Sequence, residues 1–199
     1  NGSNEIHVTA NGGASQATNT SGAFISTAYG LLNNNAATLK GITSFDILAT
    51  GGTKTTPNAI VGNGYATAYG IYNKGSSLST GNLSLDKVRA QAIEGLDAHA
   101  TAYGFYNEAT DASITLGNVD LINISSQGGQ ANPGGIANAL AYGFNSAGSG
   151  GLIIAEHFTG TMTAQGGTNG AFADTSAMGI INNSSNLNAT SINLNVTSN

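Results

Sequence analysis

Hydrophobic and polar residues alternate along most of the chain, in short stretches that end in glycine or asparagine. In residues 5–10, for example, the apolar positions are Ile6, Val8 and Ala10. A period of two places every second side chain on the same face, which predicts half-buried β-strands. Glycine, asparagine, threonine and serine, which disfavour helices, are abundant throughout. The pattern therefore predicts an all-β protein.

One of these stretches, residues 66–73 (ATAYGIYN), recurs along the whole chain. Related stretches occupy residues 26–33, 100–107, 139–146 and 175–182, and the aligned glycines are Gly30, Gly70, Gly104, Gly143 and Gly179. Successive glycines are thus 40, 34, 39 and 36 residues apart. Five copies at a period near 37 residues predict a repeat architecture.

A second apolar sequence pattern lies between the copies of the Tyr-Gly stretch. Phe45, Ile47 and Ala49 precede a Gly-Gly pair, and the same pattern returns in residues 122–129 and 160–167. Because the two patterns resemble each other, the 37-residue unit is predicted to consist of two coils of about 18–20 residues. Further apolar points are expected in each coil, at Leu39, Leu78, Ile114, Leu152 and Leu187 in one half and at Phe24, Ile60, Ile93, Ile136 and Phe172 in the other.

Stacking of these coils in phase predicts a parallel β-solenoid (β-helix) of about ten coils, paired into five repeats. At about 4.8 Å per coil the rod would be roughly 45–50 Å long. A meander of hairpins is the competing topology, but Asn11-Gly12 and Asn63-Gly64, the two hairpin-type turn signals, do not repeat in phase. Residues 85–102 could instead form one or two helical turns, although their phase in the repeat favours a strand. The closing residues 194–197 match residues 6–9, so the chain starts and ends at the same phase of its repeat.

In such a stack, equivalent residues form columns. Four columns are predicted from the first stretch, and they are Thr27, Thr67, Thr101, Leu140 and Ser176; Tyr29, Tyr69, Tyr103, Tyr142 and Met178; Leu31, Ile71, Phe105, Phe144 and Ile180; and Asn33, Asn73, Asn107, Ser146 and Asn182. The Leu/Ile/Phe column is expected to face the core, and the asparagines to form hydrogen-bonded amide ladders at a turn. The direction of the tyrosines stays open. The intervening alanines and glycines either pack closely against another sheet or form a flat surface for association or ligand binding.

Composition narrows the class of protein. The chain has 199 residues, of which 8% are charged, against about 25% in a typical soluble protein. A net charge of −5 with five Lys and Arg residues argues against nucleic-acid binding, which needs clustered basic groups. There is no cysteine, which excludes a disulfide scaffold, and no apolar run of about 18 residues. Residues 1–199 are predicted to form a single repeat domain, a segment of a longer secreted chain.

Candidate chemistry is sparse. His7, His99 and His157 are expected on different coils, and the acidic and histidine residues Glu94, Asp97 and His99 lack the spacing of a zinc motif. Four acidic residues lie at a similar phase of the repeat, and they are Asp46, Asp86, Asp120 and Glu156. They could bind cations weakly, but they are better interpreted as solubilising charges. Residues 166–170 (GGTNG) resemble a calcium loop but lack the repeated aspartate. With no nucleophile or phosphate-binding motif, we expect no catalytic, cofactor-binding or metal-binding residues, and no enzyme.

Residues 81–85 (GNLSL) and 116–121 (LGNVDL), together with the Gly/Asn/Thr/Ser bias and the lack of cysteine, resemble the β-solenoid passenger regions of large bacterial surface adhesins, of the autotransporter or haemagglutinin-like kind. The resemblance covers the whole chain and implies an extracellular, cell-surface stalk or adhesive rod. It identifies no functional residue.

Three function hypotheses follow. The first is a structural or adhesive rod or fibre, with self-association end to end or laterally and with surface glycans as further partners. The second is a binding module for ice or a polysaccharide, indicated by the threonine column, which Leu140 interrupts. The third, a polysaccharide-processing enzyme, is disfavoured because its acids and bases would have to cluster.

Overall fold

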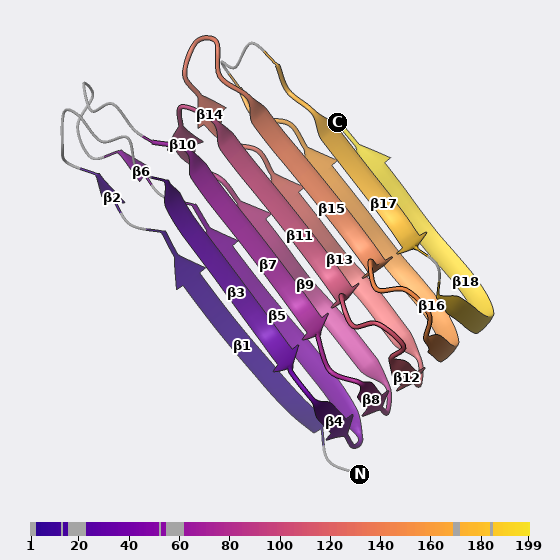
Figure 1. Cartoon of the computed structure of the whole chain (residues 1–199). Coiled ribbons are helices and arrows are strands. Elements are labelled where there is room, and N and C mark those ends of the chain that lie inside the picture. The colour runs from indigo at the N-terminus through magenta and orange to yellow at the C-terminus, as the bar shows by residue number, and fades with distance from the viewer. Residues whose placement is uncertain are drawn as a thin grey trace.

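The computed structural model describes residues 3–12, 14–15, 23–51, 53–54, 62–168, 172–183 and 185–199 as a parallel β-solenoid (Figure 1). Every pairing between its strands is parallel. The hairpin meander is therefore wrong. The strands are β1 (Ser3–Asn11), β2 (Ala14–Ser15), β3 (Phe24–Asn33), β4 (Ala36–Leu39), β5 (Ile42–Thr50), β6 (Thr53–Lys54), β7 (Gly64–Asn73), β8 (Ser77–Thr80), β9 (Leu83–Gln91), β10 (Glu94–Gly95), β11 (Ala98–Asn107), β12 (Ser113–Leu116), β13 (Val119–Gln127), β14 (Gln130–Ala131), β15 (Ala137–Ser146), β16 (Leu152–Gln165), β17 (Thr175–Asn182) and β18 (Asn186–Ser198).

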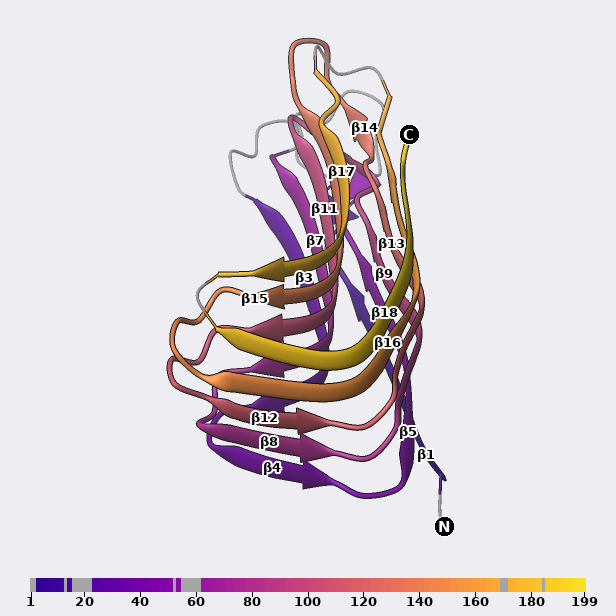
Figure 2. The same cartoon turned by 90° about the vertical axis from the view of Figure 1, so that its right-hand side faces the viewer.

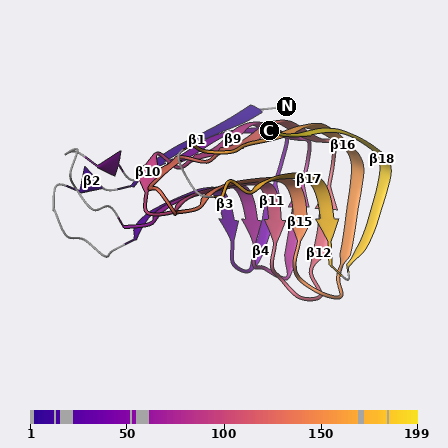
Figure 3. The ribbon, with the colours of Figure 1, turned by 90° about the horizontal axis from the view of Figure 1, so that it is seen from above.

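Each turn of the solenoid passes along three walls (Figures 2 and 3). The first, which we call the tyrosine wall, is the five-stranded sheet of β3, β7, β11, β15 and β17. The short wall contains β4, β8 and β12, and the opposite wall contains β1, β5, β9 and β13. In the last two turns β16 and β18 each run through the short wall and the opposite wall without a break.

The repeat of about 38 residues is one turn of the solenoid, and the molecule has about four such turns. The prediction of ten coils of 18–20 residues is wrong. Tyr29 pairs with Tyr69 on the next turn, whereas Phe45 lies in the opposite wall and pairs with Ile6. A Cβ atom added to Gly30 would lie 2.6 Å from Phe45 Cδ1, so the two predicted coils face each other across the core. The tyrosine wall and the opposite wall both need alternating apolar and polar residues, which explains why the two halves of one turn have similar sequences. About four turns at about 4.8 Å give a height of roughly 20 Å instead of 45–50 Å.

The alanine positions of the tyrosine wall face the core. Ala68, Ala102 and Ala141 are fully buried, while the intervening threonines and tyrosines are partly exposed on the outer face. Alternation breaks at the glycine, because Gly70 and Ile71 are both buried. A Cβ atom on Gly70 would lie 2.5 Å from the carbonyl oxygen of the next turn's glycine, so no larger residue fits. This interior packing excludes the alternative of an exposed flat surface of alanines.

The predicted columns pair in register as expected. The Leu/Ile/Phe column does face the core, since Ile71, Phe105 and Phe144 are fully buried. On the outer face the tyrosines and threonines share one side, which settles the open question of tyrosine direction. The break in alternation at the glycine explains how outward tyrosines and inward phenylalanines occur two residues apart.

The remaining predictions of apolar positions hold in part. Leu78 and Ile114 are buried in the short wall, but Leu152 is 41% exposed and Ile153 takes its place in the column. The apolar residues predicted for the second half of the unit are not buried in the core, since Ile93 is 36%, Ile136 37% and Phe172 70% exposed. Two of the predicted features, Ile60 and residues 169–170 of the GGTNG segment, lie outside the described residues.

Two further predictions are confirmed. Residues 85–102 form strands, in β9, β10 and β11, and not a helix. Val8 and Val196 begin and end a single column of the opposite wall, so residues 6–9 and 194–197 have the same phase. The described residues contain no helix long and apolar enough to cross a membrane.

Candidate functional site

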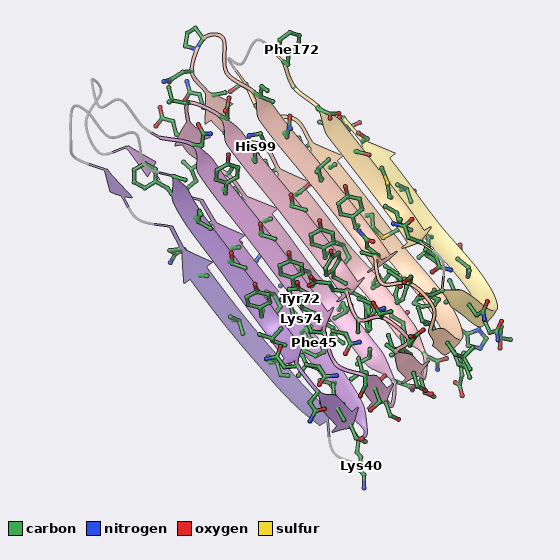
Figure 4. All side chains as sticks on the ribbon, viewed as in Figure 1. Lys40, Phe45, Tyr72, Lys74, His99 and Phe172 are labelled. Atoms are coloured by element: carbon green, nitrogen blue, oxygen red, sulfur yellow. The ribbon has the colours of Figure 1, made fainter. Side chains whose placement is uncertain are left out.

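A ladder of tyrosines is the most distinctive chemical feature of the outer surface (Figure 4). Tyr29, Tyr69, Tyr103 and Tyr142, which we call the tyrosine ladder, lie at the same position of four successive turns. Their rings are nearly parallel, with centroids 5.1, 4.9 and 4.9 Å apart. This spacing follows from the separation of neighbouring strands, about 4.8 Å, which brings identical rings into stacking distance.

Tyr72 and Tyr106 form a second row beside the ladder. The Tyr72 ring lies 4.8 Å from that of Tyr69, and the Tyr106 ring 4.9 Å from that of Tyr103. The Tyr72 hydroxyl donates to the Glu108 carboxylate, which also pairs with Lys74 at 3.5 Å. Because the ladder rings face one another, they present edges and hydroxyl groups to the solvent and are no open platform for stacking a ligand.

Burial of the ladder changes the acidity of its phenols. Burial raises the pKa of Tyr103 to about 12 from 10.0, and the neighbouring tyrosines add to this shift. Burial likewise raises the pKa of Tyr69, with Tyr103 and Tyr29 as further causes. Burial, followed by the hydrogen bond to Glu108, raises the pKa of Tyr72. The folded protein therefore holds these groups in the neutral form.

We expect the ladder to make the protein sensitive to alkali. A folded-state pKa above the unfolded value means that stability is fully present below pH 10 and falls as the pH rises from 10.0 towards 12. Tyr103→Phe keeps the ring and removes the ionisable group, so its unfolding midpoint should move to higher pH. Circular dichroism and tyrosinate absorbance, recorded together, measure this, with Tyr65→Phe as control because that ring stacks on His99 outside the ladder. Tyrosines that all ionise near pH 10 in a folded protein would contradict the expectation.

Amide side chains form a second, buried ladder where the tyrosine wall ends. Asn33 Nδ2 donates to Asn73 Oδ1 at 2.7 Å, Asn73 Nδ2 to Asn107 Oδ1 at 2.8 Å, and Asn107 Nδ2 to Ser146 Oγ at 3.2 Å. Asn73 and Asn107 also donate to main-chain carbonyls of Gly75 and Ala109. This confirms the predicted asparagine ladder for Asn33, Asn73 and Asn107, whose role is structural because they are buried, whereas Asn182 is exposed and donates to the main-chain carbonyl of Ser185.

Three of the candidate acidic residues make polar contacts with neighbouring side chains. Asp46 lies 3.8 Å from His7, 3.9 Å from Lys87 and 3.9 Å from Arg89. Asp86 accepts a hydrogen bond from Ser44 at 2.6 Å, and Thr159 donates to Asp120.

The three histidines occupy separate places. His99 stacks on Tyr65 with ring centroids 5.1 Å apart, while His157 Nδ1 lies 2.7 Å from Ser191 Oγ. Asp97 Oδ1, from the acidic and histidine group, accepts from the main-chain amide of Ile136. Within the described part of the chain, no three His, Cys, Asp or Glu residues are grouped so as to hold a metal ion.

The first and last turns leave their outer strand edges without a partner among the described residues. β1 and β3 pair on one side, with β5 and β7, and β17 and β18 pair on one side, with β15 and β16. On the last turn the core columns are open, because Ile192 is 52% and Val196 41% exposed while their partners Phe158 and Met162 are fully buried. Within the described residues, both ends thus present apolar side chains beside unpaired strand edges, exposed on the last turn and partly buried at Ile6 and Val8 on the first.

The sequence analysis missed a column of glutamines on the outer face of the opposite wall. Gln91, Gln127 and Gln165 occupy one position of three successive turns on the opposite wall, and all three are exposed. The available signal was their shared place directly before small residues, in Gln91-Ala92, Gln127-Gly128 and Gln165-Gly166. Together with the tyrosine ladder, this column gives the outer surface two regular arrays of hydrogen-bonding groups.

These features define the class of the protein as a parallel β-solenoid with regular side-chain ladders. Comparison with protein-family models finds no match, and comparisons with curated proteins and with solved structures likewise find no significant one. The functional conclusion therefore rests on the geometry.

Proposed function

We propose that this chain is a structural and adhesive β-solenoid of the extracellular surface, which forms part of a rod or fibre through parallel strand stacking. The observation that carries the proposal is the pair of ends of the described stack, each with strand edges that lack a partner among the described residues, together with the exposed core columns of the last turn. Such edges accept a further parallel strand, from additional turns of the same chain or from a second copy. The proposal includes no catalytic step, cofactor or metal ion.

Exposed apolar groups on the last turn supply the driving force for association. Covering Ile192 and Val196 with another turn would remove apolar surface from water and complete columns that already run through the molecule. In a head-to-tail pair, β1 of a second copy would continue the opposite wall next to β18. The other two walls of the second copy start with β3 and β4, which follow β1 in the chain and therefore lie further from the junction. Only one of the three walls would thus be paired between the two copies. We therefore expect weak association that depends on concentration.

Electron microscopy and sedimentation of the purified chain test this proposal. We expect short rods that join end to end or side by side as the concentration rises. The double substitution Ile192→Lys/Val196→Lys should abolish end-to-end joining, because it places charges at the open end. Leu152→Lys/Ile154→Lys is the matched control, since both residues are 41% exposed and lie in β16, which is paired with a strand on each side. Rods that stay monomeric at high concentration would count against self-association.

A second candidate is a binding module for ice. Thr27, Thr67 and Thr101 do lie in register on the outer face, which favours this function. The next position of the column is Leu140, however, which ends the threonine row after three turns. A measurement of thermal hysteresis tests this candidate, and a value of zero would remove it.

A further inference from the structure

We propose that a groove on the outer face of the opposite wall binds a neutral linear polysaccharide that runs along the axis of the rod. The groove, which we call the glutamine groove, is lined by Gln91, Gln127 and Gln165 and by the adjacent column of Arg89, Ser125 and Thr163. This inference rests on the proposed adhesive function, because it names a ligand class for that role.

The groove arises from the alternation of long and short side chains in register. Gln127 pairs with Gln91 on one side and Gln165 on the other, and Ser125 pairs in the same way with Arg89 and Thr163. Residues two apart in a strand point to the same face, so both columns face outward. Short Ser125 and Thr163 side chains beside the longer glutamines leave a hollow of about 180 Å³.

A second hollow of about 250 Å³ continues the first, and it shares all three glutamines. Ile93 and the main chain of Gly128, Gly129, Gly166 and Gly167 line it further. Each hollow is smaller than the roughly 300–1,000 Å³ of pockets that enclose small molecules. An extended polymer that rests on the surface fits this shape better than a ligand that must be enclosed.

The chemistry of the lining suits sugar hydroxyl groups. Each glutamine amide has two donor hydrogens and an acceptor oxygen, which match hydroxyls that both donate and accept. Ile93 is 36% exposed and offers an apolar contact for the C–H face of a sugar ring. The residues that line the two hollows include no carboxylate and one cation, Arg89, which lies 3.9 Å from Asp46. The chain's net charge of −5 opposes an acidic polymer, so a neutral one is favoured.

Repetition provides the affinity. Adjacent glutamines belong to strands about 4.8 Å apart, so the three amides cover about 10 Å along the axis. A single surface hydrogen bond contributes little, but a polymer that contacts several turns binds them with one loss of translational freedom. A longer stack of turns with the same column would bind more tightly for this reason.

Native affinity electrophoresis provides the test. The folded protein is run through gels that contain barley β-glucan, glucomannan, xylan or dextran, with polygalacturonate as the anionic comparison. We expect at least one neutral polymer to retard the protein. Simultaneous replacement Gln91→Ala, Gln127→Ala and Gln165→Ala should weaken binding at least about tenfold, given the loss of several hydrogen bonds. Gln127→Ala alone, expected to weaken binding about three- to tenfold, serves if the triple variant does not fold by circular dichroism.

A matched triple variant controls for any general surface effect. Thr38→Ala, Ser79→Ala and Thr115→Ala change three exposed polar residues of one column in successive turns of the short wall, and should leave retardation unchanged. Retardation by the polygalacturonate gel alone, by no neutral polymer, or equally for wild type and glutamine variants would overturn the inference. None of these results would alter the rods expected by microscopy, and a failure of rod association would leave retardation in the gels unaffected.

Discussion

Phe105→Ala should lower the free energy of unfolding by about 3–5 kcal/mol, the range found when a buried phenylalanine is truncated. Phe105 is fully buried, and its ring stacks on Phe144 with centroids 4.9 Å apart. Phe144 in turn contacts the edge of Phe158 at 5.3 Å, so the cavity would open between the tyrosine wall and the opposite wall. The neighbouring turns cannot close it, because their main chains are held by strand pairing on both sides.

Urea unfolding followed by circular dichroism measures this loss. Ile25→Ala is the appropriate control, since Ile25 lies in the same wall with 65% of its surface exposed, and we expect a change below about 0.5 kcal/mol. A loss below about 1 kcal/mol for Phe105→Ala would mean that the walls can move together, and would contradict the rigid stack described above.

Asn73→Ala should lower the free energy of unfolding by about 2–4 kcal/mol, because it leaves two buried partners without their hydrogen bonds. Asn73 is fully buried and accepts from Asn33 Nδ2 while it donates to Asn107 Oδ1. Removing the central amide therefore interrupts the ladder on both sides. Its hydrogen bond to the Gly75 carbonyl, at 3.1 Å, is lost as well.

Comparison with Asn34→Ala isolates the contribution of the ladder. Asn34 is next to Asn33 in the chain but is exposed, so its replacement should change stability by less than about 0.5 kcal/mol. The double variant Asn33→Ala/Asn73→Ala should lose less than the sum of the two single variants, since they share one hydrogen bond. Additive losses would show that the amides do not act as a ladder.

The core column that contains Phe105 and the asparagine ladder are also relevant to the proposed role as a rod. Each turn contributes one leucine, isoleucine or phenylalanine to the core and one asparagine or serine to the corner, so an added turn of the same kind repeats similar contacts with the turn before it. Stability of a stack is then approximately the sum of the stabilities of its turns and the interfaces between them. A rod built in this way can lengthen without a new core, which suits a structural element that holds a binding surface such as the glutamine groove.

The columns of equivalent residues are the part of the fold that the sequence predicts best. The Tyr-Gly stretch recurs five times, and its copies pair in the register that the alignment of Gly30, Gly70 and Gly104 predicts. Parallel stacking and the asparagine ladder followed from that register. No such signal distinguished residues that face a neighbouring turn from residues that face the same turn across the core, and so ten coils were predicted where the solenoid has about four turns.

The candidate surfaces were harder to predict. Strict alternation cannot describe the bend at Gly70, after which Ile71 is buried although Tyr69 faces outward. The direction of the tyrosine ladder therefore could not be determined from the pattern. The glutamine groove was missed for a related reason, since a hollow depends on the relative lengths of side chains on different turns.

The amino-acid sequence by itself determined the all-β class, the repeat, the parallel register and the residues of each column, because a residue in a parallel stack interacts chiefly with its own equivalents one turn away. Only the tertiary structure decided how many walls make one turn, which face of the tyrosine wall is buried and where the surface is hollow. Those properties depend on contacts across the core between residues such as Gly30 and Phe45, whose separation in the chain has no fixed relation to the repeat.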